Sequence, residues 1–574
     1  MMKRIAQYFL LLCIFCSFIT GAQAQAPNQQ GFEIMKNLDI YSTLIKELNQ
    51  DYVDEIKPGE LTEKGIEAML ESLDPYTNFI PESQVEDYKF ITTGQYGGIG
   101  SLIHQQGEYV VISEPYEGSP AQKSGIRAGD KILEINGQKA KGKTYDEVST
   151  ILKGQAGTTV SLVLLRDGEE KPIEKTITRE IIKIDNISYY GMVDKTIGYI
   201  KLSGFTQNAA RELRQSFLKL KDGNDLKGII IDLRGNGGGL LNEAVDIANI
   251  FVDRGQEIVS TKGKKADKNR THMTSNPPVD VNIPVVVLVD RQSASASEIL
   301  AGSLQDLDRG VILGQRTFGK GLVQNVVPLS YNAQLKITVA KYYIPSGRCI
   351  QAIDYTHKTK DGSFSKIPDS LIRAFKTRGG RIVYDGGGIN PDIPTIAPKF
   401  SSIAMTLYSK YYMFDFATKY AREHASIVPA ATFEITDTIY TEFLSFLAGK
   451  DYSYSTKSER ALEALKTEAS KENYFNAIKD EYDHLLKRMA DDKKEDLNKY
   501  RDQIKELLKM EIVTRYYYQK GKIEAALKND PQLSDAIATL RNSEKYTAIL
   551  AGKFVQPKPV IPAVIDNEDD QPIE

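Results

Sequence analysis

The sequence contains few of the residues that most often carry out chemistry or hold metals. Among 574 residues there are five histidines, three cysteines and no tryptophan. The histidines are scattered, without the spacing of a metal-ligand set, so the sequence predicts no metal cofactor. Cys13 and Cys16 lie in the first 24 residues, which leaves Cys349 alone in the rest of the chain. That part therefore has no internal disulfide, and its stability must come from hydrophobic cores.

The chain also lacks an excess of charge of either sign. It has 73 Lys and Arg against 76 Asp and Glu, with 41% apolar and 26% charged residues. This is an ordinary composition for a soluble globular protein, and without a basic excess no binding to nucleic acid is expected. The length is sufficient for about three or four domains.

The amino-terminal residues have the layout of an export signal. Lys3 and Arg4 precede an apolar run over residues 8–19, which ends shortly before Ala22-Gln23-Ala24. The pattern predicts a signal peptide over residues 1–24 and a periplasmic protein. The run is shorter than the about 20 residues that a membrane span needs. Retention of the segment as an anchor, with weak association with the inner membrane, is the alternative.

The most informative stretch runs from Val285 to Pro328. An unbroken apolar run, Val285 to Val289, predicts a buried strand, and the spacing predicts a helix from about Ser297 to Asp306. The serine-rich turn between them places Ser295 near the helix start, where free backbone N–H groups suit an oxyanion. The same serine opens Ser295-x-x-Glu298, which is an ordinary capping box. These residues alone leave both interpretations open, a capping serine and a nucleophile.

A serine nucleophile needs a base, and this stretch contains no histidine. Lys320, between Gly319 and Gly321, is the candidate. An ammonium ion cannot accept a proton, so burial would have to lower the pKa of Lys320 well below about 10.4.

Two glycine-rich stretches nearly match nucleotide-binding motifs. Gly314 to Lys320 fits a phosphate-binding loop except at its last position, where Gly321 replaces Ser or Thr and a strand is predicted to follow. Residues 234–239 nearly match a dinucleotide fingerprint, but Leu240 stands at its final Gly or Ala position. The sequence therefore does not predict nucleotide binding.

Two motifs around the serine and the lysine resemble a known family. SASASEILAGSLQD followed by RTFGKGLVQ is similar to the carboxyl-terminal processing peptidases, also called tail-specific proteases. These are PDZ-containing serine proteases with a Ser-Lys dyad. The resemblance implies that Ser295 is the nucleophile, that Lys320 is the base and that Gln324 orients the lysine. It implies no cofactor.

The resemblance also assigns a role to the glycine loop, Arg234 to Gly239. In the family this loop faces the nucleophile and lends a backbone N–H group to the oxyanion hole. That role falls on Gly238, with Gly237 as the alternative, and Ala296 is the second donor. Asp232 and the arginine that opens the loop are expected to brace it.

Residues 92–182 are similar to a PDZ domain of the bacterial protease type. The segment GSPAQKSGIRAGDKILEINGQ carries this resemblance, among short predicted strands around one helix. Gly97, Gly98, Ile99 and Gly100 lie where such domains hold a free carboxylate with backbone N–H groups. A plain glycine turn is the alternative.

The predicted fold is an α/β protease core, similar to the crotonase and Clp-protease arrangement, with an inserted PDZ domain, a small N-terminal helical region and a C-terminal all-α region. The predicted boundaries are 1–24 for the signal peptide, 25–91 for the N-terminal helical region, 92–182 for the PDZ domain, 183–396 for the Ser-Lys peptidase core, 397–553 for the C-terminal helical domain and 554–574 for a disordered tail. Residues 25–37 are predicted to be flexible, and residues 261–282 to form a mobile excursion. Apolar stripes in the C-terminal helices indicate bundle packing, with a homo-oligomer through the helical regions or substrate threading as alternatives.

The resulting hypothesis is an exported serine endopeptidase that cuts protein or peptide substrates near their free C-termini. The alternative from another class is a non-catalytic periplasmic PDZ scaffold that binds protein C-termini without cutting them.

Overall fold

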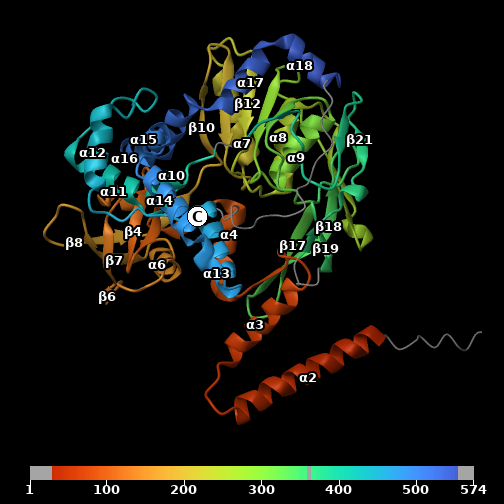
Figure 1. Ribbon diagram of the computed structural model, residues 1–574. Helices are drawn as coiled ribbons and strands as arrows, with labels where there is room; N and C mark the ends of the chain where they lie inside the picture. Colours follow the sequence, from red (N-terminus) through yellow and green to blue (C-terminus); the bar gives the residue numbers. More distant parts are fainter. Residues whose placement is uncertain (1–28, 359–363, 397–398, 554–574) are drawn as a thin grey trace, which may run out of the picture. The chain divides into compact units, whose positions relative to one another are not determined.

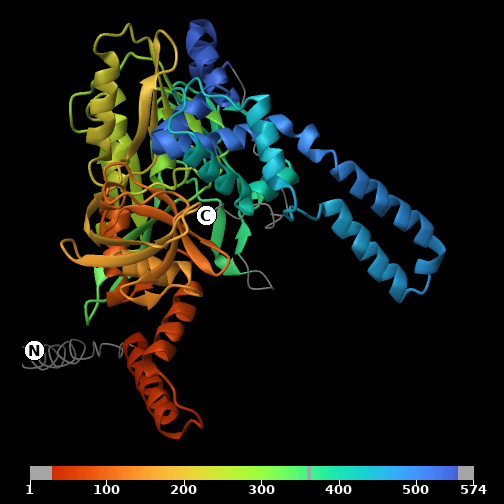
Figure 2. The same ribbon diagram turned by 90° about the vertical axis from the view of Figure 1, so that its left-hand side faces the viewer.

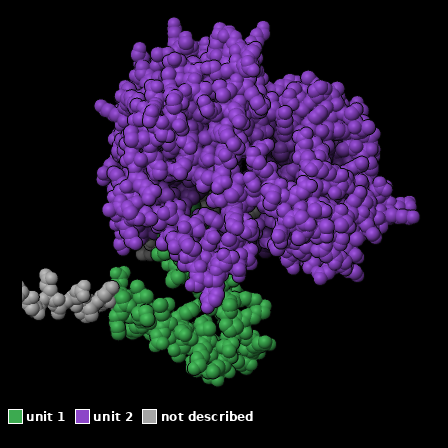
Figure 3. Space-filling view, turned by 180° about the vertical axis from the view of Figure 1, so that it is seen from behind, with its two compact units in different colours: residues 1–79 green, residues 80–574 purple. Residues whose placement is uncertain are grey.

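The computed structural model describes residues 29–358, 364–396 and 399–553 (Figure 1). The chain forms two compact units, residues 1–79 and 80–574 (Figure 3). The predicted signal peptide and the predicted disordered tail lie outside the described residues. Within the described ranges, no helix combines the length and apolar character that crossing a membrane requires.

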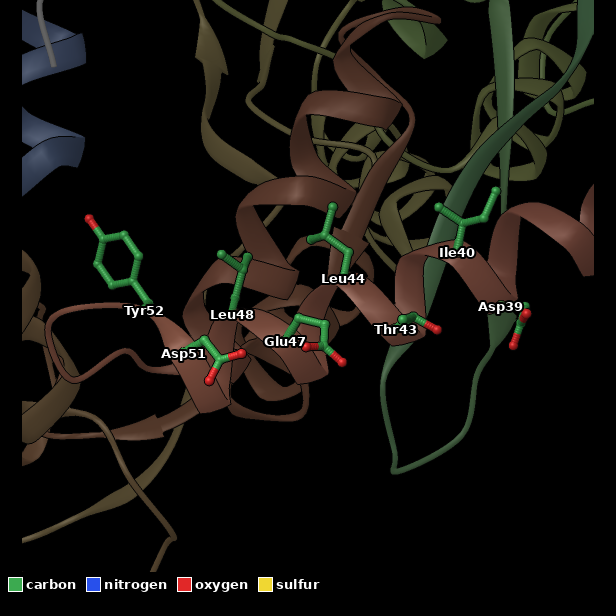
Figure 4. Close-up of a pocket in the computed structure, with 8 residues that line it drawn as sticks. All are labelled: Asp39, Ile40, Thr43, Leu44, Glu47, Leu48, Asp51 and Tyr52. Carbon is green, nitrogen blue, oxygen red and sulfur yellow. The ribbon is translucent and has the colours of Figure 1, made fainter.

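The first unit contains two helices, α2 (Gln29–Asp51) and α3 (Pro58–Glu71), and β1 (Asn78–Ile80) lies at its boundary. The prediction of a flexible segment over residues 25–37 is wrong from Gln29 onward, because α2 begins there. A single Gly31 costs a helix only about 1 kcal/mol, too little to stop it. The apolar side chains of Ile40, Leu44 and Leu48 are exposed on α2 and line the pocket drawn in Figure 4.

A small β domain begins the second unit. Its main sheet has the strand order β3-β4-β5-β7-β8, with β6 beside β5, and β2 pairs separately with β9. The strands are β2 (Gln95–Gly98), β3 (Ser101–Gln106), β4 (Tyr109–Pro115), β5 (Lys131–Ile135), β6 (Gln138–Lys139), β7 (Thr159–Leu165), β8 (Ile173–Thr178) and β9 (Glu180–Lys183). The helices are η1 (Glu82–Gln84), α4 (Val85–Thr93), α5 (Pro120–Lys123) and α6 (Tyr145–Leu152). Alternate residues of β7 pack against α6 in one core, as expected for a half-exposed sheet.

The central sheet of the second unit has the order β10-β11-β12-β15-β16-β23. Its strands are β10 (Ile187–Met192), β11 (Ile197–Leu202), β12 (Gly228–Asp232), β15 (Val285–Val289), β16 (Val311–Gly314) and β23 (Ile393–Pro394). All neighbours pair in parallel except β10, which runs antiparallel to β11. The predicted strand Val285–Val289 is confirmed, and the predicted helix after it is α9 (Ala296–Asp306).

Helices cover both faces of this sheet, which explains its unbroken apolar strands. Val285, Val287 and Val289 face α7 (Ala209–Lys221), α8 (Leu241–Phe251) and α9 in one core cluster. Val286 and Leu288 face the opposite way and pack with α17 (Pro531–Arg541) and α18 (Ser543–Leu550). Helices α17 and α18, the last two in the part of the chain that the structure describes, therefore complete the α/β core.

A second sheet packs against helices α8 and α9. Strand β18 (Gln334–Tyr343) pairs with both β17 (Leu322–Pro328) and β13 (Glu257–Gly263), and β13 pairs with β14 (Arg270–Met273). The prediction of a mobile excursion over 261–282 is therefore wrong for residues 261–273, which form β13, the turn η2 (Ala266–Lys268) and β14. Local hairpin pairing orders this polar segment without a strong hydrophobic pattern. Short hairpins and one turn follow, namely β19 (Ile353–Lys358) with β20 (Phe364–Lys366), η3 (Asp369–Leu371), and β21 (Ala374–Lys376) with β22 (Ile382–Tyr384).

The C-terminal helices form a further core of their own. They are α10 (Ser402–Ser409), α11 (Tyr412–Glu423), α12 (Asp437–Leu447), α13 (Lys457–Lys471), α14 (Phe475–Lys493), α15 (Asp496–Lys499) and α16 (Arg501–Leu527). Apolar residues of α10, α11, α12 and α16 share one cluster, so bundle packing is confirmed for the stripe around Ile504. Helices α13 and α14 pair as a hairpin that extends away from the other helices in Figure 2.

Candidate active site

Ser295 lies in the turn between β15 and α9, and its backbone is strained. Its φ of 55° and ψ of −112° fall in a region that residues with a side chain rarely adopt. Sharp turns of this kind, between a strand and a helix, are known to expose serine nucleophiles. Ser295 is half-buried, whereas all the remaining residues from Ser293 to Asp306 are buried. The turn thus brings this one side chain of the segment towards solvent.

The carboxylate of Asp290 stabilises the turn by hydrogen bonds to its backbone. It accepts hydrogen bonds from the N–H groups of Gln292 and Ser293, each at 3.0 Å. The same carboxylate accepts the N–H of Gly235 at 3.0 Å, so it also ties the turn to the glycine loop. The Ser293 hydroxyl donates to the carbonyl of Leu233 at 2.8 Å, which adds a second link. These bonds keep Ser295 in its strained conformation.

The side chain of Glu298 connects the turn that carries Ser295 to the loop that carries Lys320, residues 317–320. Its Oε2 accepts the N–H of Ser295 and the N–H of Lys320, each at 2.9 Å. Its Oε1 accepts the Thr317 hydroxyl at 2.6 Å and the Gly319 N–H at 2.8 Å. The backbones of the predicted nucleophile and the predicted base therefore meet at one oxygen atom.

Burial dominates the electrostatics of Glu298. The side chain is fully buried, which raises its pKa from 4.5 to about 7 in spite of four hydrogen-bond donors. Each oxygen accepts two hydrogen bonds, which favour the ionised form and oppose part of the effect of burial on the pKa.

Tyr342 makes a second link between the serine and the lysine. Its hydroxyl lies 2.5 Å from the carbonyl oxygen of Lys320 and 3.3 Å from that of Ser295. Because a hydroxyl has one hydrogen to donate, the two carbonyls share it. Gln324, which the sequence predicts to orient the lysine, lies opposite Thr338 in the β17–β18 pair. Its Nε2 donates to the Thr338 hydroxyl at 3.1 Å.

The glycine loop lies directly against Ser295 and Ala296. A Cβ atom added to Gly238, whose φ is +97°, would lie 2.9 Å from Ser295 Cβ and 2.8 Å from Ala296 N. Only glycine permits so close an approach at this φ. The predicted oxyanion donors are thus next to the predicted nucleophile. The Gly238 N–H donates to Asn236 Oδ1 at 2.9 Å, so a substrate oxyanion would compete with that amide oxygen.

Asn236 fastens the glycine loop to the nucleophile helix. It is buried, and its backbone carbonyl accepts the Ala294 N–H at 3.1 Å and the Ser297 hydroxyl at 2.8 Å. Its side-chain amide donates to the carbonyl of Leu202 at 2.7 Å. Loop, helix start and sheet are therefore joined through one residue.

The predicted carboxylate-binding residues form a tightly packed strand and turn. Gly97 and Gly98 pair with Ile181 and Glu180 of β9, and residues 98–100 are buried. A Cβ at Gly97 would lie 2.1 Å from the carbonyl oxygen of Gly154. The domain's own packing therefore already requires glycine at this position.

Sequence reasoning missed several residues that hold this site together, among them Asn236, Glu298 and Tyr342. Glu298 was visible only as the last position of a capping box, and the carboxylate part of that box is present. The other two gave no signal, because Asn236 is one polar residue in a glycine run and Tyr342 ends a strand pattern. In the ranges that the structure describes, no group of three or more His, Cys, Asp or Glu side chains is arranged to hold a metal ion.

Comparisons with known proteins agree with this architecture. Residues 196–359 match the model of peptidase family S41, residues 111–166 that of a PDZ domain, and residues 403–540 that of a probable PDZ-protease C-terminal helical domain. The combination of α/β core, PDZ domain and C-terminal helices that the sequence predicts is confirmed.

Named relatives match over most of their own length. The carboxy-terminal-processing protease of Bartonella bacilliformis is 34% identical over 359 residues, which are 62% of this chain and 82% of the relative. The carboxy-terminal processing protease CtpA of Bacillus subtilis is 28% identical over 478 residues, which are 81% of this chain and 100% of the relative. A solved structure, the photosystem II D1 C-terminal processing protease, is 29% identical, covers 61% of this chain and 91% of its own, and has a TM-score of 0.33.

Proposed function

The chain belongs to peptidase family S41, with the carboxy-terminal processing proteases, and we propose that it is an exported serine endopeptidase that cuts protein substrates near their C-termini. Ser295 is the nucleophile and Lys320 the general base. Gly238 and Ala296 donate N–H groups to the oxyanion. The PDZ domain captures the free carboxylate of the substrate at Gly97 to Gly100. Export to the periplasm follows from the signal layout of residues 1–24.

One observation carries the catalytic part of the proposal. The backbones of Ser295 and Lys320 donate to the same oxygen of a buried carboxylate, and Ser295 alone in its segment is strained and half-exposed. A capping serine needs neither feature. Strain of this kind is held at functional sites because the surrounding structure enforces it.

The chemical steps use only side chains and water. Neutral Lys320 takes the proton of the Ser295 hydroxyl, and the serine oxygen attacks the scissile carbonyl. The N–H groups of Ala296 and Gly238 stabilise the oxyanion, the latter once it leaves Asn236 Oδ1. The peptide C–N bond breaks as the lysine returns its proton to the leaving amine. Water, deprotonated by the lysine, then attacks the acyl-enzyme, the ester C–O bond to Ser295 breaks, and the lysine returns the proton to the serine oxygen.

Capture of a free carboxylate is tested by comparing two versions of one substrate. A flexible reporter protein with an apolar C-terminal tail is prepared as the free acid and as the amide. Because a hydrogen bond to a charged group contributes about 1.5–3 kcal/mol, we expect KM to be at least about 10-fold higher for the amide, with kcat changed little. Steady-state cleavage assays measure both constants.

Binding of the same two reporter forms to an inactive variant controls for the cleavage step. Ser295→Ala should bind the free acid as tightly as the wild type and the amide more weakly, in fluorescence anisotropy. Equal KM values for acid and amide would remove carboxylate capture from the proposal while leaving the dyad in place. Tight binding of the acid by a wild type that does not cut it would instead favour the scaffold function.

A further inference from the structure

Arg234, the first residue of the glycine loop, lies between the core sheet and helix α17. On the core side, its Nε and Nη2 donate to the two carboxylate oxygens of Asp232 at 3.0 and 2.7 Å. On the helix side, its Nη2 donates to Asp530 Oδ2 at 2.6 Å and its Nη1 to Gln532 Oε1 at 2.7 Å. The guanidinium is thus held by two segments almost 300 positions apart in the sequence.

The negative charge of Asp232 is already compensated by residues of the core, without any contribution from α17. Asp232 is buried, which raises its pKa, but Lys201 and Arg234 outweigh that effect and hold it at about 2. The Tyr199 hydroxyl also donates to Asp232, at 2.6 Å. The carboxylate of Asp232 therefore has its charge partners within the sheet, and Asp530 is a second, additional anion for Arg234. A braced loop, as the sequence predicts, would need only Asp232.

Asp530 and Gln532 are themselves rigidly held. The Asp530 Oδ1 caps α17 by accepting the N–H groups of Gln532 and Leu533 at 2.9 and 3.1 Å. The Gln532 amide donates to the Thr395 hydroxyl at 2.6 Å, and Gln532 is only 4% exposed. Leu533 belongs to the core cluster on the second face of the sheet. Helix α17 cannot shift without uncovering that face, so it offers Arg234 a fixed anchor.

Fixing Arg234 fixes the entrance of the glycine loop. The backbone carbonyl of Arg234 accepts a hydrogen bond from the Lys201 ammonium at 2.6 Å. Four residues later, Gly238 lies against Ser295 and Ala296. Groups that stabilise an oxyanion act only when they are held in place before the reaction, and small displacements are costly. Anchoring at Arg234 therefore limits how far the loop can move away from the serine.

We propose that Asp530 and Gln532 are positioning residues for the glycine loop, so that the C-terminal helical region completes the active site of this peptidase. The proposal rests on the proposed function, because it concerns the loop that supplies the Gly238 N–H group. Neither residue touches substrate. They act through Arg234.

The test compares Asp530→Asn with two variants of the same helix. Asp530→Asn keeps the oxygen that caps α17 but removes the charge next to Arg234. Asp535→Asn removes an equal charge from the exposed side of α17, and Arg541→Gln removes an ion pair of the same helix with Asp194 at its other end. We expect Asp530→Asn to lower kcat about 10-fold per active site with unchanged KM, and both controls to keep wild-type values.

Active sites are counted by the burst of leaving group from an activated peptide ester, so that misfolded protein does not count. A second readout does not need cleavage, because amide hydrogen exchange at residues 235–239 should become faster in Asp530→Asn and not in the controls. If Asp530→Asn does not fold, Gln532→Leu replaces it. In an Arg234→Gln background, Asp530→Asn should have no further effect.

Unchanged kcat per site together with unchanged exchange at residues 235–239 would overturn the proposal. Failure of the proposed function has a different signature, since cleavage would then survive Ser295→Ala. Hydrogen exchange at residues 235–239 tests the positioning role of Asp530 whether or not Ser295 is the nucleophile.

Discussion

Replacing Ser295 with alanine is expected to lower kcat by at least about 10⁴-fold. The acyl-enzyme cannot form without the serine oxygen, and the residual rate would come from the oxyanion donors and substrate binding alone. Steady-state cleavage of the reporter protein, with protein concentration and folding checked by circular dichroism, measures the loss. Binding of the free-acid tail should be retained, because the PDZ domain is unchanged.

Ser303→Ala is the matched control for this substitution. Ser303 is a buried serine of the same helix whose hydroxyl donates only to the Leu300 carbonyl, at 3.1 Å. It should keep wild-type kcat at the expense of a small loss of stability. Because a nucleophile and its base act as a unit, Ser295→Ala combined with Lys320→Met should be no slower than either single variant. Cleavage at a normal rate by Ser295→Ala would contradict the assignment of the nucleophile.

Replacing Glu298 with glutamine should have the second largest effect. An amide in place of the carboxylate turns one acceptor oxygen into a donor that faces two N–H or O–H donors. Those groups lose their partners in a buried site, and the turns that carry Ser295 and Lys320 separate. We expect kcat/KM to fall about 100-fold, since displacements of about 1 Å produce losses of that size. Reporter cleavage measures the change.

The same substitution in another capping box controls for the loss of a helix cap. Glu459 accepts the N–H of Thr456 at 2.7 Å at the start of α13, in the C-terminal helical region. Glu459→Gln removes this cap and an ion pair with Lys493, so it should lower stability and leave kcat/KM unchanged. If Glu298→Gln and Glu459→Gln were equally active, Glu298 would have only a capping role.

The pH dependence of stability gives an independent check on Glu298. Its pKa of about 7 in the folded state lies above the unfolded value of 4.5. Its contribution to stability is therefore fully present below about pH 4.5 and is lost as the pH rises through about 7. Glutamine does not titrate. The unfolding free energy of the wild type relative to Glu298→Gln should thus fall by on the order of 3 kcal/mol between pH 4.5 and 8.

Local sequence signals were sufficient for the parts of the fold that local physics determines. Val285 to Val289 is apolar at every position because helices cover both faces of the sheet. The unbroken apolar run was therefore enough to identify a buried strand. The small-residue turn after this strand indicated a serine at a helix start, and the motif resemblance singled out Ser295 among its serines. The absence of histidine had already indicated Lys320 as the candidate base, and the motif resemblance added Gln324 and Gly238, which periodicity could not have paired with the serine.

Long-range contacts were not predictable in the same way. Glu298 gives the pattern of a capping box whether or not a second loop donates to it, and that loop lies about 20 residues further along the chain. The contact of Asp530 with Arg234 leaves no trace in either segment, since an aspartate before a helix proline is an ordinary start. The packing of α17 and α18 on the sheet was missed for the same reason. Their apolar faces suit a helical bundle equally well.

The most direct test of the account is to trap and locate the acyl-enzyme. An activated peptide ester should acylate the protein faster than water removes the acyl group, which gives a burst of leaving group. After acid quenching, mass spectrometry of tryptic peptides should find the acyl group on Ser295, within residues 292–309. Lys320→Met and Ser295→Ala should give no burst. A burst that persists in Ser295→Ala, or an acyl group on another residue, would contradict the central claim.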